Sequence, residues 1–352
     1  MIGIIAKLSF LPRGRKLEGG LAIQKTLYIF SDGTLRREGN TLCYETGEGK
    51  RFLPVEDIQE IMAFGEVELN KKLLEFLSQH EILLHYFNYY DYYMGTFYPR
   101  EHYNSGFITL KQAEHYLNES LRLELAKSFV SGALRNIETV LKYYHKRGVP
   151  LGETAEKIKN AEENVAGITD IAELMALEGN AREEYYRAFD LILDNPVFAF
   201  EKRTRRPPRN NLNTLISFGN SLLYTIVLSE IYKTHLDPRI GYLHATNFRR
   251  FSLNLDVAEI FKPIIIDRLI FTLVDKKMID ESDFEKETGG IVLKEKGRKR
   301  FIEELDKRLN TTINHRAVGR PVSYRRLIRM ELYKIEKHII GEEPYRPFIA
   351  QW

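Results

Sequence analysis

The chain has 352 residues, a length that exceeds one typical hydrophobic core and fits two domains. Hydrophobic residues make up 43% and charged residues 29%, as in soluble globular proteins, and no uninterrupted apolar run reaches the roughly 18 residues of a membrane span, which excludes an integral membrane protein. The single cysteine, Cys43, excludes an internal disulfide and predicts a reducing, cytoplasmic location, while a net charge of +3 is too small to indicate nucleic-acid binding by itself.

Residues 1–25 carry no assigned role. They begin with an apolar run, Met1–Ala6, but lack the basic region and the cleavage signature of a signal peptide. They can be read as an upstream-misassigned start or as a mobile arm, and both readings stay open.

Residues 26–98 predict a small β-rich domain. Asp32-Gly33 between two extended runs predicts a hairpin, and residues 70–79 predict a short helix. The remaining pattern consists of short apolar runs separated by turn residues. The predicted strands cover residues 27–30, 35–38, 40–44, 51–54, 58–64, 82–87 and 92–97.

This β-rich domain is predicted to hold a homodimer and to contribute no catalytic residue. Its sequence supplies apolar strands and several tyrosines, which are common at self-association surfaces, but no cluster of acidic residues with histidine. His85 lies in an apolar run and is predicted to be a packed residue. The tyrosines at 89, 90, 92 and 93 could stack on bases, although cross-strand packing or a domain interface is the favoured reading.

A linker over residues 99–107 leads to a larger α-helical domain, residues 108–352. From here the apolar residues recur three and four apart, which is the helical period. The fold class is therefore α+β, with the β-rich domain first. Predicted helices cover about 110–145, 168–193, 212–234, from 254 onward, 295–309 and 324–340, with a variable charged region over 275–296.

Basic residues cluster twice in the helical domain. The first cluster lies within 201–209 and the second near the C-terminus, and such clusters are the footprint expected of phosphate-backbone binding. A solvated face is the commoner alternative. The clusters contain Lys202, Arg203, Arg205, Arg206 and Arg209, and then Arg320, Arg325, Arg326, Arg329, Lys334 and Lys337.

A loop that ends on a histidine precedes a helix with two carboxylates. The loop Leu236–His244 contains Asp237-Pro238 and Gly241, and Asp256 and Glu259 follow three residues apart, so that they can converge with His244 on one cation. Each residue also has a structural alternative. A lone histidine can be a satisfied polar residue, and the two acids can cap a helix N-terminus.

Three motifs together resemble the CRISPR-associated endonuclease/integrase family over about residues 26 to 345. Glu178-Gly179-Asn180-Ala181 matches its E-G-x-A helix, residues 236–244 match its L-D-P-x-x-G-x-L-H loop, and residues 256–259 match its D-x-x-[D/E] helix start. Residues 207–219 match its P-P-x-x-x-x-N-x-L-x-S-x-G helix entry. The resemblance implies that Glu178, His244 and Glu259 are catalytic residues and metal ligands, with Asp256 as a supporting carboxylate.

The resemblance implies an α+β enzyme of CRISPR adaptation that inserts captured double-stranded DNA as new spacers into a CRISPR array. One imidazole with carboxylates suits Mg²⁺ or Mn²⁺. Expected partners are a second copy of the chain and a small second adaptation subunit. Alternatives are a structure-selective DNA repair nuclease and a non-enzymatic DNA-binding protein. Candidate DNA contacts are Arg182, Arg203, Arg205, Arg206, Arg249 and Arg250.

Overall fold

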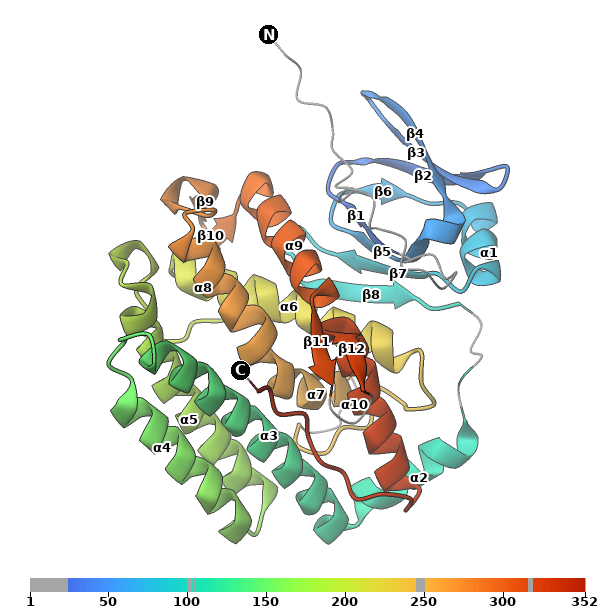
Figure 1. The fold of residues 1–352 in the computed structure, drawn as a ribbon. Helices are drawn as coiled ribbons and strands as arrows, with labels where there is room; N and C mark the ends of the chain where they lie inside the picture. Colours follow the sequence, from blue (N-terminus) through green and yellow to red (C-terminus); the bar gives the residue numbers. More distant parts are fainter. Residues whose placement is uncertain (1–24, 100–102, 104, 245–250, 316–318, 352) are drawn as a thin grey trace. The chain divides into compact units, whose positions relative to one another are not determined.

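The computed structural model describes residues 25–99, 103, 105–244, 251–315 and 319–351, and it divides between residues 102 and 103 into two compact units (Figure 1). That division falls inside the predicted linker. The first unit is β-rich and the second is mainly helical, so the predicted α+β class is confirmed. The N-terminal extension up to residue 24, and Arg249 and Arg250, lie outside the described residues.

Two four-stranded sheets and one helix build the first unit. In one sheet the first three strands are parallel and the fourth is antiparallel, in the order β1 (Lys25–Ile29), β5 (Ile58–Ala63), β7 (Leu83–Phe87), β8 (Tyr93–Phe97). The other runs β4 (Gly49–Pro54), β3 (Thr41–Thr46), β2 (Gly33–Glu38), β6 (Val67–Glu68). Helix α1 (Lys71–Gln79) begins where the Asn70 side chain accepts from Leu73 N, and its apolar face joins one core with both sheets.

The hairpin predicted at Asp32-Gly33 is wrong. Residues 32 and 33 carry the chain from one sheet to the other, and the β2–β3 hairpin turns instead at Gly39-Asn40, where Gly39 has φ +61°. Asp32 Oδ1 accepts from Glu66 N at 2.8 Å, and a Cβ at Gly33 would lie 2.4 Å from the Glu45 carbonyl oxygen. Gly33 is thus needed for close backbone approach rather than for a turn.

The aromatic and histidine residues of this unit divide between core and surface. His85 is fully buried, and its Nδ1 lies 2.7 Å from Thr96 Oγ1, which confirms the prediction of a packed residue. Tyr89 and Tyr90 are exposed in the β7–β8 connection. Stacking on bases and self-association through these tyrosines both stay predictions.

The second unit consists mainly of helices around the buried α6 (Asn211–Ile231). The helix predicted over 110–145 is two helices, because Asn118 ends the first and its side chain accepts from Leu121 N to start the second. The others are α2 (Gly106–Leu117), α3 (Glu119–His145), α4 (Gly152–Asn164), α5 (Ile171–Leu193), α7 (Leu253–Lys262), α8 (Arg268–Asp275), α9 (Glu295–Asn310) and α10 (Tyr324–Ile339).

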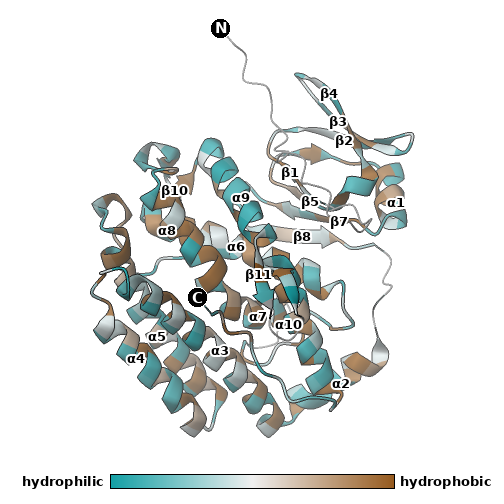
Figure 2. Cartoon of the chain, in the orientation of Figure 1, coloured by the Kyte–Doolittle hydropathy of each residue, from teal (hydrophilic) through white to brown (hydrophobic). Residues whose placement is uncertain are grey.

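Two short hairpins interrupt this unit, which the sequence predicts to be all-α. The first lies in the predicted variable charged region and the second between two predicted helices. They are β9 (Phe284–Glu287) with β10 (Gly290–Leu293), and β11 (Thr312–His315) with β12 (Arg320–Ser323). Strand β9 carries Glu285, Lys286 and Glu287, a composition that gives no strand signal. Figure 2 shows that strand β10 is largely hydrophobic, whereas helix α9, which follows it, is largely hydrophilic.

Helix α6 is long and apolar enough to cross a membrane, and within the described ranges it is the one helix of that kind. However, 83% of its most apolar window is buried inside the unit. Helices α7 and α10 pack against α6 and against each other, and α3 packs against α7, so the apolar residues of α6 lie in the core.

A chain truncated to begin near Glu101 is expected to be monomeric, because the apolar sheet edges and tyrosines proposed to hold the dimer lie before that point. Sedimentation velocity of the truncated and full-length chains checks this, with a dimer expected only for the full-length chain. A truncated chain that still dimerises would place the interface in the helical unit.

Candidate active site

Two carboxylates from different helices meet on one guanidinium. Glu178 lies on α5, and one turn later Arg182 Nε donates to Glu178 Oε1 at 3.2 Å. Arg182 Nη2 donates to Glu259 Oε2 on α7 at 2.5 Å. Glu259 and Arg182 are both buried, whereas the Glu178 side chain keeps 20% exposure. Arg182 therefore joins the E-G-x-A helix to the D-x-x-E helix.

Lys262 completes this cluster from one turn after Glu259. Its ammonium is buried, contacts Glu259 Oε1 and lies 4.8 Å from the centre of the Tyr224 ring. Burial raises the pKa of Glu259, but the charges of Lys262 and Arg182 outweigh it and bring that pKa to about 2. Glu259 is consequently ionised at neutral pH.

The Asp256 carboxylate binds the backbone of the loop that ends at His244, whereas the Glu259 carboxylate binds Arg182 and Lys262. Its Oδ2 accepts from Tyr242 N at 2.5 Å and Leu243 N at 3.1 Å, and its Oδ1 accepts from His244 N at 3.0 Å. Oδ1 also lies 2.7 Å from His244 Nδ1, so that nitrogen carries the proton. Both oxygens of Asp256 are engaged, and among the described residues none donates a hydrogen bond to Nε2, whose lone pair in the neutral imidazole can bind a ligand.

The same contacts tune His244 electrostatically. Burial lowers the pKa of its imidazole, but the hydrogen bond and charge of Asp256, followed by the charge of Glu259, raise the pKa overall. The influence of Glu259 shows that the imidazole and the carboxylate cluster share one electrostatic environment.

The loop before His244 depends on residues that the sequence did not single out. Gln112 of α2 accepts from Asp237 N at 2.7 Å and donates to Asp237 O at 3.2 Å, while Ser252 Oγ accepts from Gly241 N at 2.9 Å. A Cβ at Gly241 would lie 2.8 Å from Asp256 Oδ2. Glycine is therefore required where the loop passes the buried carboxylate. Neither Gln112 nor Ser252 has a sequence signal, because their partners lie in other segments.

The donor chemistry fits a hard divalent cation. An imidazole nitrogen and two carboxylates are ligands of the type that Mg²⁺ and Mn²⁺ accept. Within the described ranges, however, no three acidic, cysteine or histidine side chains already stand as a ligand set, and Arg182 and Lys262 cover the oxygens of Glu259. The residues can therefore hold the cation once Arg182 and Lys262 release the oxygens of Glu259.

The arginines predicted to contact DNA occupy different environments. Arg182 is committed to the carboxylates, and Arg203 donates to Asn213 Oδ1 at 2.8 Å and to Ser217 Oγ at 3.0 Å, which braces the start of α6. Arg205 and Arg206 are exposed. Contact with DNA stays a prediction for all of them, and the exposed pair is the better placed.

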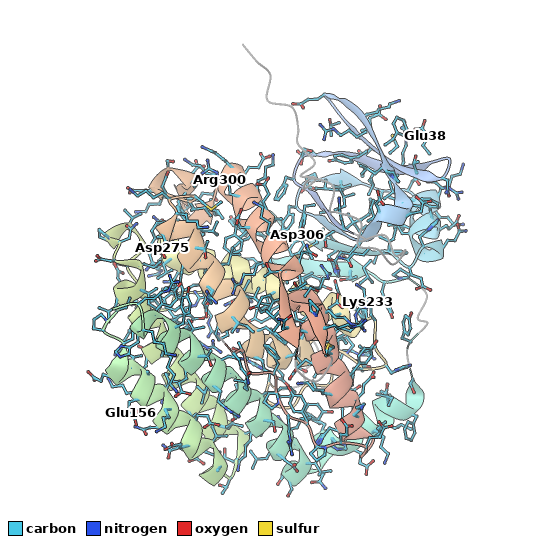
Figure 3. The ribbon with its side chains drawn as sticks, viewed as in Figure 1. Glu38, Glu156, Lys233, Asp275, Arg300 and Asp306 are labelled. Atoms are coloured by element: carbon cyan, nitrogen blue, oxygen red, sulfur yellow. The ribbon has the colours of Figure 1, made fainter. Side chains whose placement is uncertain are left out.

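The C-terminal basic series is partly structural. Glu230 is fully buried near the end of α6 and accepts from Arg325 Nε at 2.9 Å and from Arg329 Nε at 2.6 Å. The Nζ atom of Lys233, which is labelled in Figure 3, lies 3.3 Å from Glu230 Oε1. Burial raises the pKa of Glu230, but these three cations lower it to about 2. Arg325 and Arg329 therefore tie α10 to α6.

The chain matches known proteins over most of its length. The family model for "CRISPR associated protein Cas1" matches residues 27–307. A CRISPR-associated endonuclease Cas1 of Thermodesulfovibrio yellowstonii is 59% identical over 330 residues, which is 94% of this chain and 100% of that protein. The solved structure of a Cas1 protein from Thermotoga maritima has a TM-score of 0.83 at 51% identity and covers 92% of this chain and 100% of that one.

A casposase bound to its integration product shares the fold. Its TM-score is 0.82, with coverage of 93% of this chain and 94% of the casposase chain, and the sequence identity is 20%. At that identity the likeness shows the fold alone.

Replacing Glu230 by glutamine is expected to destabilise the protein by about 3–5 kcal/mol at neutral pH, because three cations then face no charge. The lowered pKa of Glu230 means that its stabilisation is present above the unfolded value of 4.5 and is lost as pH falls toward about 2. The difference between wild type and Glu230→Gln in urea unfolding should thus narrow below about pH 4.5. Exposed Glu156→Gln on α4 is the matched control, and an equal loss there would contradict the assignment.

Proposed function

Because the chain belongs to the Cas1 family, we propose that it is a metal-dependent DNA endonuclease and integrase that inserts captured DNA fragments into a CRISPR array. The observation that carries this proposal is that Arg182 bridges Glu178 and Glu259, while Asp256, one turn before Glu259 on α7, holds His244 by hydrogen bonds and the charge of Glu259 acts on the same imidazole. A site built only for stability has no need to leave His244 Nε2 available.

Glu178, Glu259 and Nε2 of His244 would hold one Mg²⁺ or Mn²⁺, and the nitrogen ligand favours Mn²⁺ somewhat. When bound, such a cation stabilises charge on the phosphate and lowers the pKa of the attacking hydroxyl. Water as nucleophile gives strand cleavage, and a DNA 3′-hydroxyl gives joining.

The chain's own residues prepare these ligands. Arg182 and Lys262 keep Glu259 ionised, and Asp256 holds the single proton of neutral His244 on Nδ1. Because Asp256 also raises the pKa of this imidazole, Nε2 presents its lone pair once the pH exceeds that raised value. Asp256 acts as a positioning residue, since both of its oxygens are engaged by the loop.

Integration at both strands of a repeat needs two active sites, so we propose a homodimer that works with a small second adaptation subunit on double-stranded DNA. The exposed Arg205 and Arg206 supply part of the phosphate track. A repair nuclease with identical chemistry is the second enzyme candidate, and joining of DNA ends to a repeat-containing plasmid separates the two. Strand cleavage that depends on Mn²⁺ excludes a merely DNA-binding protein.

His244→Ala and Glu259→Ala are each expected to abolish Mn²⁺-dependent cleavage and joining while DNA affinity stays within about twofold, because phosphate contacts carry most of the affinity. The assay combines a short duplex and a repeat-containing plasmid, with and without the second subunit. His145→Ala, an exposed histidine at the end of α3, serves as the matched control. Full activity of either site variant would remove the proposed site.

Neutralising Arg205 and Arg206 together is expected to weaken DNA binding for every sequence and to lower the salt slope by up to about two units. Arg203→Gln should instead lower the melting temperature, because it removes bonds to Asn213 and Ser217. Binding titrations at several salt concentrations check the slopes, with exposed Lys157 and Lys159 of α4 replaced as the control pair. An unchanged slope in the Arg205/Arg206 variant would mean that this surface does not follow DNA.

A further inference from the structure

Asp267 is a buried acid that the proposed chemistry does not use. It is fully buried, and in the described part of the chain neither of its carboxylate oxygens has a hydrogen bond of normal geometry, although the buried Tyr185 hydroxyl is oriented to favour its ionised form. Such a group is costly to bury, so it calls for an explanation. The titratable groups that influence it are Arg182, Lys262, Tyr185 and Glu259. Burial raises the pKa of Asp267 to about 7, while Arg182 and Lys262 oppose that rise.

The helix that carries Glu259 reaches Asp267 through one π-helical turn. Helices α7 and α8 run on from each other, and η4 (Pro263–Asp267) between them is π-helical. In a regular α-helix a residue eight positions on is rotated about 80° from the first. The extra residue of a π turn offsets about 100° of that rotation and brings Asp267 back to within about 20° of the Glu259 face.

One nitrogen of the Arg182 guanidinium is not used by the two glutamates. Its Nε and Nη2 bind Glu178 and Glu259, but Nη1, which is also buried, has no hydrogen-bond partner in the described residues. Burial lowers the pKa of Arg182, whereas Glu259, Glu178 and Asp267 are among the groups that raise it, and the net result is a pKa well above the usual value. An unused buried donor and an unused buried acceptor thus share one electrostatic environment.

We propose that Asp267 is a positioning residue that receives the Arg182 guanidinium when a divalent cation takes the oxygens of Glu178 and Glu259. The inference rests on the proposed metal site. Without a second acceptor, Arg182 would be left as a buried unpaired cation beside a divalent one, which is strongly unfavourable. Asp267 is a buried acceptor of this kind, and its charge already acts on Arg182.

The charges of the cluster fit this role. Glu178, Asp256, Glu259 and Asp267 carry four negative charges when ionised, and Arg182 and Lys262 carry two positive ones. One divalent cation makes the cluster neutral, with His244 uncharged. Without Asp267 the loaded cluster would hold one excess positive charge in a buried site. The negative charge of Asp267 therefore allows the site to hold one divalent cation without an excess positive charge.

The test measures Mn²⁺ affinity of the full-length chain by isothermal titration calorimetry at pH 7.5. Asp267→Asn is expected to weaken Mn²⁺ binding by about tenfold or more, while its melting temperature in EDTA is unchanged or higher than that of wild type. Asp283→Asn is the matched control, because Asp283 is also a buried aspartate but contacts Arg300 and the start of a different turn. It should keep wild-type Mn²⁺ affinity.

A double-mutant cycle shows whether Asp267 acts through Arg182. In an Arg182→Gln background, Asp267→Asn should change Mn²⁺ affinity by less than about twofold. An undiminished loss in that background, or unchanged affinity in the single variant, overturns the inference. Failure of the wild-type chain to bind Mn²⁺ would overturn the proposed metal site as well, so the two failures are distinguishable. Asp267→Ser provides the same reading if the asparagine variant does not fold.

Discussion

The hydrogen bonds around the Asp256 carboxylate are the constraint on which the candidate site depends. One buried side chain receives three consecutive backbone N–H groups, from Tyr242 to His244, and the imidazole of the last. An isolated buried carboxylate is unfavourable, and these four donors compensate it. The same carboxylate consequently determines the shape of the loop, the orientation of the imidazole and the position of its proton. A change in any of these three alters the hydrogen bonds of Asp256 in the first turn of α7.

The second organising feature is a pattern of buried charges that pair across helices. Arg182 connects α5 to α7, and Arg325 and Arg329 connect α10 to α6. Apolar packing supplies most of the stability of such a unit, but it discriminates weakly between alternative helix registers. Paired buried charges discriminate strongly, because a shifted register would leave a charge without its partner. The two networks therefore specify which faces of the helices meet.

Sequence reasoning predicted the order of the two units and the motifs that carry Glu178, His244 and Glu259, because periodicity and short motifs are local signals. The spacing of Asp256 and Glu259 allowed both to reach one cation, with Asp256 as a supporting carboxylate, and the structure gives the two residues different partners. Residues three apart differ by about 60° around a helix, enough for Asp256 to meet the loop and Glu259 to meet α5. The pairing of Arg182 with Glu259 could not be predicted for a related reason, since the two residues are 77 positions apart in the sequence. Glycine at residue 33 likewise read as a turn because its close neighbour, Glu45, belongs to another strand.

The parallel pairing in the first unit has a consequence for how the chain acquires its structure. Strand β1 has to wait for β5, which follows only after the whole β2–β3–β4 meander has been made. The meander contains only antiparallel neighbours joined by short turns, so its closure entropy is low and it is expected to form first. Because it has three strands, its two ends lie at opposite edges, so that β1 enters at one edge and β5 leaves from the other, as a parallel pair requires. The meander would thus serve as the folding nucleus of the unit, and the parallel sheet would be its late product.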